Sequence, residues 1–303
     1  MVLILGGTGR GNVQLVDGLR RLGVHAVLLS RERLRELAAP EDVVLGRLDV
    51  LPTLDGVEPG LLDLLLLERS GVRTLNGAQT LLTAHDKLRT WRALAAHGLP
   101  QPRTWHVRRA DELRVAPLPV AVKPRFGSWG WDVERVRDAS ELERCLATLG
   151  ERPWFGRHGA IVQELLPHEG SDLRLIVAGG RVVGVVERTA APGEWRTNVS
   201  LGGSIRAVEP PRAACRLAAA AAAAAECDLV GVDLFPAGEG WVVLELNGCV
   251  DFDSTYSLAG RDVYADIAES LRLAQPAVTP VPWRASSTSP AGGCGEPPAG
   301  PTW

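Results

Sequence analysis

Three oxygen-bearing side chains share one predicted hairpin near residue 240. Residues 230–247 are apolar and β-branched at both ends and are broken in the middle by proline and glycine, which predicts two antiparallel strands. A turn centred near Glu239 places Asp233 opposite Glu245, and Asn247 points to the same face as Glu245. Opposed carboxylates on apolar strands repel each other, and a hard cation reverses that cost. We therefore expect a magnesium–nucleotide site; a solvated outer sheet face is the alternative.

The only two lysines of the chain, Lys87 and Lys123, stand beside segments suited to phosphate. The other basic residues, of 33 in total, are arginines. Lysine offers a compact charge on a flexible stem. Lys123 ends a predicted strand before the loop Gly127-Ser-Trp-Gly130, whose backbone N–H groups can close over phosphates. Lys87 lies in the first turn of a helix predicted over 85–97, where a cation gains nothing from the helix dipole. The alternatives are that the two lysines remain by chance in an arginine-rich chain, and that the loop is an ordinary glycine hairpin turn.

Residues 1–84 predict a small parallel α/β unit. The expected strands are 2–5, 25–29 and 72–75, and the expected helices are 12–22, 32–37 and 60–70. The turn after the first strand matches GxxGxG and not GxGxxG, because Asn12 replaces the last glycine. Ser30 and Arg31 suit NADP better than NAD. An NADP-binding oxidoreductase is therefore an alternative function, and tight strand-to-helix packing is an alternative reason for the glycines.

Three further segments follow. We expect a second small α/β unit over 85–158, and a larger sheet with a metal site over 159–275, which begins with a strand at 160–166. An alanine-rich helix is predicted over 210–226. Residues 276–303 are rich in Pro, Gly, Ser and Ala with few apolar anchors, which predicts a disordered tail.

The composition excludes several classes of function. Hydrophobic residues at 46% and charged residues at 23% describe a globular protein, and the net charge of −3 favours neither nucleic acid nor an anionic membrane as partner. The most apolar run, 61–67, is interrupted by Asp63 and is too short to span a bilayer. Five scattered cysteines without a CxxC pair predict a reducing, cytoplasmic location.

Short motifs follow one another between residues 70 and 274: Asp86-Lys-Leu88, Val122-Lys-Pro124, Gly127-Ser-Trp-Gly130, Gln163-Glu164, Asp172-Leu-Arg174, Glu187-Arg188, Trp195-Arg-Thr-Asn198, Gly202-Gly203, Gly231-Val-Asp233 and Glu245-Leu-Asn247. This ordered series resembles the ATP-grasp carboxylate–amine ligases, in particular their RimK-like branch, which includes the α-L-glutamate ligases and the LysX-type ligases. The resemblance implies an ATP-grasp fold, in which two α+β subdomains sandwich ATP, preceded by a Rossmann-like domain.

The resemblance also implies roles for individual residues. The phosphates of ATP would be held by two lysines and covered by a loop: Lys87, Lys123, Gly127, Ser128 and Gly130. The adenine edge and the ribose hydroxyls would be bound by Glu164, Leu165, Leu166 and Asp172. Two Mg²⁺ ions, or Mn²⁺ in their place, would be held by Asp233, Glu245 and Asn247. The acyl substrate and the transferred phosphoryl group would face Arg188, Arg196 and Asn198, although an ion pair between neighbouring strands is an alternative for Arg188.

The implied activity is an ATP- and Mg²⁺-dependent ligase that forms an amide. A carboxylate is a poor acyl donor, so it first accepts the γ-phosphoryl group, and an amine then attacks the acyl phosphate. The expected partners are ATP, an amino acid and a carboxylate acceptor that is free or on a carrier protein. The sequence leaves the oligomeric state open. A nucleotide-binding protein without catalysis is the remaining alternative.

Overall fold

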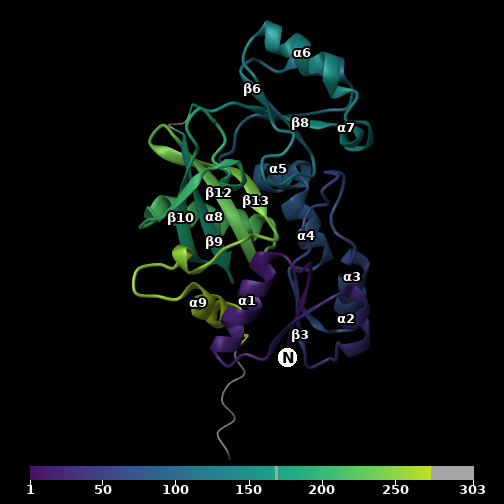
Figure 1. Ribbon diagram of the computed structural model, residues 1–303, viewed down its shortest axis with the longest axis vertical. Helices are drawn as coiled ribbons and strands as arrows, with labels where there is room; N and C mark the ends of the chain where they lie inside the picture. Colours follow the sequence, from purple (N-terminus) through teal and green to yellow (C-terminus); the bar gives the residue numbers. More distant parts are fainter. Residues whose placement is uncertain (168–169, 274–303) are drawn as a thin grey trace, which may run out of the picture.

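The computed structural model describes residues 1–167 and 170–273, and within them the chain forms three sheets (Figure 1). The N-terminal sheet is parallel, with strand order β2-β1-β3-β4. A four-stranded antiparallel sheet has the order β5-β8-β6-β7, and a five-stranded antiparallel sheet has the order β11-β10-β9-β12-β13. The predicted combination of α/β and α+β parts is confirmed. The predicted tail lies outside the described residues.

The parallel unit alternates strands and helices as predicted, with one strand more. Its elements are β1 (Val2–Leu5), α1 (Arg10–Arg21), β2 (Ala26–Leu29), α2 (Arg31–Leu37), β3 (Val43–Gly46), α3 (Leu61–Arg69), β4 (Arg73–Leu75) and α4 (Ala78–His85). The sequence prediction missed β3 and α4. β3 is only four residues long and largely buried, so it shows no alternation of apolar and polar residues.

The small antiparallel sheet and its helices follow. The elements are α5 (Lys87–Ala96), β5 (Thr104–Val107), a 3₁₀ helix (Ala110–Val115), β6 (Val120–Pro124), β7 (Glu134–Val136), α6 (Ala139–Leu149), α7 (Pro153–His158) and β8 (Ala160–Glu164). β8 pairs with β5 and β6, so the prediction that this strand opens the larger sheet is wrong. The chain leaves the small sheet only after Glu164.

The prediction of a single helix over 85–97 is also wrong at its N-terminal end. Asp86 has an extended backbone, with φ −89° and ψ 100°, and separates α4 from α5. Its carboxylate accepts the Leu88 N–H at 3.1 Å and caps α5. His85 therefore ends one helix, and Lys87 begins the next.

The large sheet carries the site on one face and a helix on the other. Its elements are β9 (Ser171–Ala178), β10 (Arg181–Thr189), β11 (Ser204–Ala207), α8 (Arg212–Ala224), β12 (Leu229–Ala237), β13 (Gly240–Asn247) and α9 (Val263–Ser270), with short 3₁₀ turns at Val199–Leu201 and Ser254–Tyr256. Buried alanines of α8 pack on alternate residues of β9 and β12, such as Leu175 and Val232. Small side chains allow this helix to lie close to the sheet.

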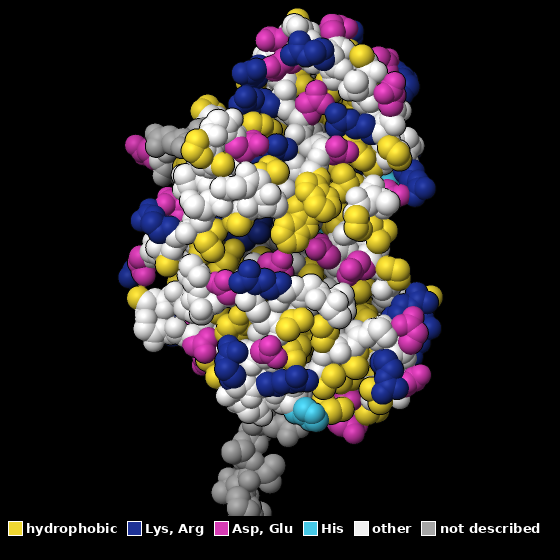
Figure 2. Space-filling view, in the orientation of Figure 1, with side chains coloured by type: hydrophobic (Ala, Val, Ile, Leu, Met, Phe, Trp, Pro, Cys, Tyr) yellow, Lys and Arg dark blue, Asp and Glu magenta, His cyan; other side chains and the backbone are white. Residues whose placement is uncertain are grey.

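The surface in Figure 2 mixes basic and acidic side chains over the face shown in Figure 1, without a large area of one sign. In the described part of the chain, no helix combines the length and apolarity needed to cross a bilayer.

Candidate active site

The face of the large sheet opposite α8 gathers charged residues from neighbouring strands. Asp233 on β12 pairs in register with Glu245 on β13, as predicted, and with Arg174 on β9. The register of β12 and β13 shifts between Asp233 and Leu234. This bulge gives β13 one extra residue, so Leu244 and Glu245 both line the cleft on this face.

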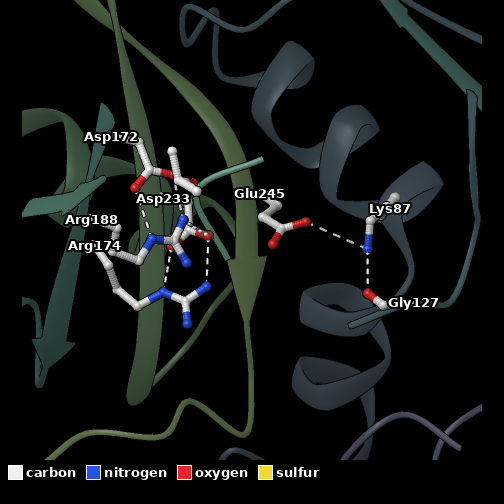
Figure 3. A network of polar contacts seen from close by, with 8 residues as sticks. Lys87, Gly127, Asp172, Arg174, Arg188, Asp233 and Glu245 are labelled. Atoms are coloured by element: carbon white, nitrogen blue, oxygen red, sulfur yellow. Dashed lines mark hydrogen bonds and ion pairs between the residues drawn. The ribbon is translucent and has the colours of Figure 1, made fainter. Parts of the chain in front are cut away.

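Two arginines neutralise the buried Asp233 carboxylate (Figure 3). Arg174 donates from Nε and Nη2 to the two carboxylate oxygens at 2.7 Å each. Arg188 donates from Nη2 to Asp233 Oδ2 at 2.8 Å, and its Nε donates to Asp172 Oδ1 at 2.7 Å. Burial alone would raise the pKa of Asp233, but the two guanidinium groups hold it below its ordinary value. The face is thus a connected network of charges, and the ion pair considered as an alternative for Arg188 is present.

Lys87 turns away from its own helix and faces the hairpin. Its Nζ donates to the Gly127 carbonyl at 2.6 Å and lies 3.5 Å from Glu245 Oε2 (Figure 3). The backbone N–H of Lys87 donates to the Arg125 carbonyl at 3.0 Å. The capping carboxylate of Asp86 also accepts Arg125 Nε at 2.6 Å. These contacts fix the first turn of α5 beside the loop that follows β6.

Lys123 is the last residue but one of the fully buried strand β6, and the residue is 6% exposed. Within residues 1–167 and 170–273, its ammonium group has no ion pair within 4.0 Å. Burial lowers the pKa of Lys123 to about 8, although Glu245 partly opposes the shift. A poorly solvated cation without a partner is suited to bind an anionic ligand.

The loop Gly127–Gly130, hereafter the covering loop, is held against the segment that follows β10. Arg196 Nη1 donates to the Gly130 carbonyl at 2.8 Å, and Ser200 Oγ donates to the Trp129 carbonyl at 2.8 Å. A side chain at position 130 would meet Asn198 Oδ1 at 2.7 Å, and φ is +74° there, so glycine is required. The covering loop thus closes over the cleft.

A cleft of about 790 Å³, measured to its open mouth, lies between the two antiparallel sheets. It brings together most of the predicted site residues: Lys87, Lys123, Gly127, Ser128, Gly130, Glu164, Leu165, Leu166, Arg188, Arg196, Asn198, Asp233 and Glu245. The volume falls in the usual range for small-molecule sites. Residues from the small sheet face residues from the large sheet across this space.

Asp172 and Asn247 do not line the cleft. The carboxylate of Asp172 is completely buried, and it accepts hydrogen bonds from Arg188 and from Thr197 Oγ1 at 2.8 Å. The ribose contact implied for Asp172 is therefore not available in this conformation. Asn247 lines a second cavity, which adjoins the cleft at Glu245.

The expected adenine segment lies at the end of β8. Leu165 N–H already donates to the Pro119 carbonyl at 3.1 Å. The Glu164 carboxylate accepts Arg103 Nε at 3.1 Å, and this contact lowers the pKa of Glu164. The Glu164 side chain is thus engaged at the surface, and the segment offers its backbone and leucine side chains to a ligand.

The expected metal ligands fit a divalent cation to different degrees. Within the described residues, Glu245 contacts only Lys87 among charged groups. Asn247 Nδ2 is buried there without a partner, but an amide nitrogen is a donor, so the ligand expected from Asn247 is its Oδ1 atom. Both oxygens of Asp233 already accept from arginines. In the described ranges no three His, Cys, Asp or Glu side chains cluster to hold a metal alone. The donor set is two carboxylates and an amide, which suits Mg²⁺ only when substrate phosphates complete its coordination.

The glycine-rich turn after β1 faces carboxylates and not an open phosphate site. A side chain at position 11 would collide with Asp251, and one at position 7 would come within 3.1 Å of Glu58 Oε1. These carboxylates stand at the start of α1, where a Rossmann turn would bind a pyrophosphate, and would repel it. The structure therefore favours close packing as the reason for these glycines and disfavours NADP binding.

The sequence analysis assigned no role to Arg174 and Arg125, which the structure places in the site. Arg174 holds Asp233, and Arg125 holds the Asp86 cap of α5. A signal was available for Arg174, since it stands two residues after Asp172 and therefore on the same strand face. Arg125 carried no such signal, because its partner is 39 residues away in the chain.

Comparison with known proteins agrees with this geometry. A sequence model described as the RimK-like ATP-grasp domain matches residues 84–271, which is more than half of the chain. The chain belongs to the RimK-like ATP-grasp family. The predicted family, ATP-grasp fold and ligase class are confirmed.

Two curated relatives of this RimK-like chain carry ligase names. A "Probable alpha-L-glutamate ligase" of Xanthomonas euvesicatoria is 33% identical over 211 residues, which cover 68% of this chain and 70% of the relative. "Glutamate--LysW ligase ArgX" of Sulfurisphaera tokodaii is 30% identical over 215 residues, which cover 68% of this chain and 75% of the relative.

Solved structures support the same fold at lower identity. A RimK domain ATP-grasp protein from Sphaerobacter thermophilus aligns with a TM-score of 0.66 and 22% identity, over 89% of this chain and 99% of that one. D-alanine–D-alanine ligase from Bacillus anthracis complexed with ATP aligns with a TM-score of 0.64 and 19% identity, over 90% of this chain and 93% of that one. ATP-grasp ligases bind ATP with Mg²⁺, and one similar structure contains Mg and ADP.

Proposed function

We propose that this RimK-like ATP-grasp ligase joins a carboxylate to the amine of an amino acid through an acyl phosphate. The observation that carries the proposal is the pairing of Asp233 with Glu245 on one hairpin, facing both lysines of the chain across one cleft. Phosphoryl transfer needs positioning and charge neutralisation more than an acid or a base, and the cleft supplies both.

We assign the residues as follows. Lys87 and Lys123 would hold the phosphates under the covering loop, with adenine beside the segment 164–166. Two Mg²⁺ ions, or Mn²⁺, would be held by Asp233, Glu245 and Asn247, and would neutralise charge on the phosphates. The acyl substrate would face Arg188, Arg196 and Asn198, since guanidinium groups suit planar carboxylates. The cytoplasmic location also stays a prediction from cysteine usage.

The test is a screen for ADP release with Mg–ATP, pooled L-amino acids and candidate carboxylates. L-Glutamate is the first amine to test, because curated relatives are named as glutamate ligases. We expect ADP release that requires both substrates, and an amide product detected by mass spectrometry. Binding of ATP without turnover in any mixture would favour a non-catalytic nucleotide-binding protein.

The charge of Lys123 predicts a pH dependence for nucleotide binding. Burial lowers the pKa of this group to about 8, so it is a cation at pH 7 and largely neutral at pH 9. Because phosphates bind the cation, the affinity for ADP without metal should fall about tenfold between these pH values. Isothermal titration calorimetry measures it, and Lys123→Arg should flatten the profile. An equal affinity of the wild type at both pH values would contradict the assignment.

A further inference from the structure

The second cavity lies between the N-terminal parallel unit and the large sheet. It has a volume of about 610 Å³ up to its mouth and shares Ser128, Arg188, Asn198 and Glu245 with the cleft. A molecule in the second cavity would therefore reach the wall that the γ-phosphate of ATP would approach. The two ends of this cavity carry groups of opposite charge.

The end on the large sheet offers guanidinium donors. Arg174 and Arg188 bind Asp233 and Asp172 through Nε and Nη2 only. In the described residues, neither Nη1 atom has a hydrogen bond, and both side chains line the second cavity. In Figure 3 both Nη1 atoms point away from Asp172 and Asp233. Free guanidinium N–H groups beside the expected metal ligands suit a carboxylate that is about to be phosphorylated.

The end on the N-terminal unit offers carboxylates. Asp49, which follows β3, and the exposed Asp251, which follows β13, both line the cavity. Burial raises the pKa of Asp49 to about 6, and Glu58 and Asp251 add to the shift. At pH 7 this carboxylate is still ionised but poorly solvated. A cationic group of a ligand would relieve that cost, whereas an anion would be repelled.

His85 adds an unused hydrogen-bond acceptor to the same cavity. The side chain is 5% exposed, and its Nε2 atom has no partner within the described residues. Burial lowers the pKa of His85 to about 4, although a hydrogen bond to the Leu48 backbone partly opposes this shift. The ring is therefore neutral at pH 7. With the ring proton used in that contact, Nε2 is left to accept a hydrogen bond. An ammonium group is a suitable donor.

A cationic group held in this way is not the amine that attacks. The attacking nitrogen must carry a free lone pair, and carboxylates around an ammonium group keep it protonated. The cation therefore belongs to the substrate whose carboxylate is activated. Resting on the ligase function proposed above, we infer that the second cavity binds the acyl donor as an amino acid, with its ammonium group at Asp49 and Asp251 and its carboxylate at Arg174 and Arg188.

This arrangement would serve the phosphorylation of the donor carboxylate by ATP and the attack of the amine that follows. A carboxylate oxygen of the amino acid attacks the γ-phosphorus, the bond from that phosphorus to the β,γ-bridging oxygen breaks, and ADP leaves. A nitrogen nucleophile then attacks the acyl carbon, the carbon–oxygen bond to phosphate breaks, and the nitrogen loses a proton. The ammonium group of the donor takes no part in either step and serves recognition only.

Hydroxylamine trapping tests the inference without knowledge of the natural amine. The full chain is incubated with Mg–ATP, hydroxylamine and each of the L-amino acids, their N-acetyl forms, and dipeptides with a free N-terminus. An acyl phosphate appears as a hydroxamate. We expect at least one donor with a free ammonium group to react, with kcat/KM about 100-fold above that of its N-acetyl form.

Two variants test whether Asp49 and Asp251 bind the ammonium group of the donor. Asp49→Asn and Asp251→Asn should each lower kcat/KM for the free donor about 10- to 100-fold and leave the N-acetyl form unchanged, because each loses one charge-assisted contact. Asp17→Asn, an exposed change on α1, is the matched control and should behave as the wild type. Should Asp49→Asn fail to fold, the exposed Asp251 carries the test.

The outcomes separate this inference from the proposed function. Hydroxamate that forms equally well from N-acetyl donors, or a free-to-acetylated ratio that neither variant changes, would overturn the inference and leave the ligase function standing. If no donor of this panel gives a hydroxamate while Mg–ATP still binds, the inference fails; the ligase function fails only if the ADP-release screen proposed above is negative as well.

Discussion

Lys123→Ala is expected to lower ATP-dependent ligation by about 10³-fold while leaving the fold intact. The loss is expected because no other group can replace the Lys123 ammonium group as a phosphate ligand. Lys87 is the chain's only other lysine, and its ammonium group already contacts Gly127 and Glu245. The fold should survive because the described residues offer Lys123 no ion pair that would be broken. ADP release and a thermal melt measure the two effects.

Lys123→Met is the matched control for this result. It keeps most of the buried stem and removes only the charge, so its activity should be as low as that of Lys123→Ala and its melting temperature at least as high as that of the wild type. Activity near the wild-type rate in either variant would remove Lys123 from the phosphate site.

Asp233→Asn is expected to lower the free energy of unfolding by about 3 kcal/mol as well as abolish turnover. The neutral amide leaves Arg174, whose only carboxylate partner in the described chain is Asp233, as a half-buried cation without a counter-charge. Chemical denaturation followed by circular dichroism measures the change. Glu187→Gln, which breaks the exposed Glu187–Arg206 pair on the same sheet, should cost no more than about 1 kcal/mol.

The double variant Asp233→Asn with Arg174→Met separates the structural role from the chemical one. Removing both charges should recover part of the lost stability, but not the activity, because a proposed metal ligand is still absent. Wild-type stability in Asp233→Asn alone would mean that the buried pair contributes nothing, and would contradict the network described for this sheet face.

The sequence predicted the hairpin correctly because its pairing depends on local information. The position of the turn fixes the register, and the register places Asp233 opposite Glu245. The same argument did not extend to Asp172, which was expected in the cleft. Strand alternation indicates the face on which a side chain lies, but the Arg188 guanidinium that buries Asp172 comes from another strand.

Long-range pairing accounts for the other errors. β8 was assigned to the larger sheet, although its partners β5 and β6 lie earlier in the chain, and no local pattern states which sheet a buried strand joins. The break between α4 and α5 depends on Asp86, whose carboxylate is held by Arg125 after β6. Neither the pairing of β8 nor the contact between Arg125 and Asp86 can be predicted from the residues that lie near β8 or Asp86 in the sequence.

The most direct test of the site is electron paramagnetic resonance of Mn²⁺ in the presence of a non-hydrolysable ATP analogue. The wild type should immobilise Mn²⁺ only when the nucleotide is present, because two carboxylates and an amide leave part of the coordination to phosphates. Glu245→Ala should lose the immobilised signal, since this carboxylate, unlike that of Asp233, accepts no hydrogen bond from an arginine in the described residues. Unchanged Mn²⁺ binding by Glu245→Ala with nucleotide would contradict the hairpin metal site.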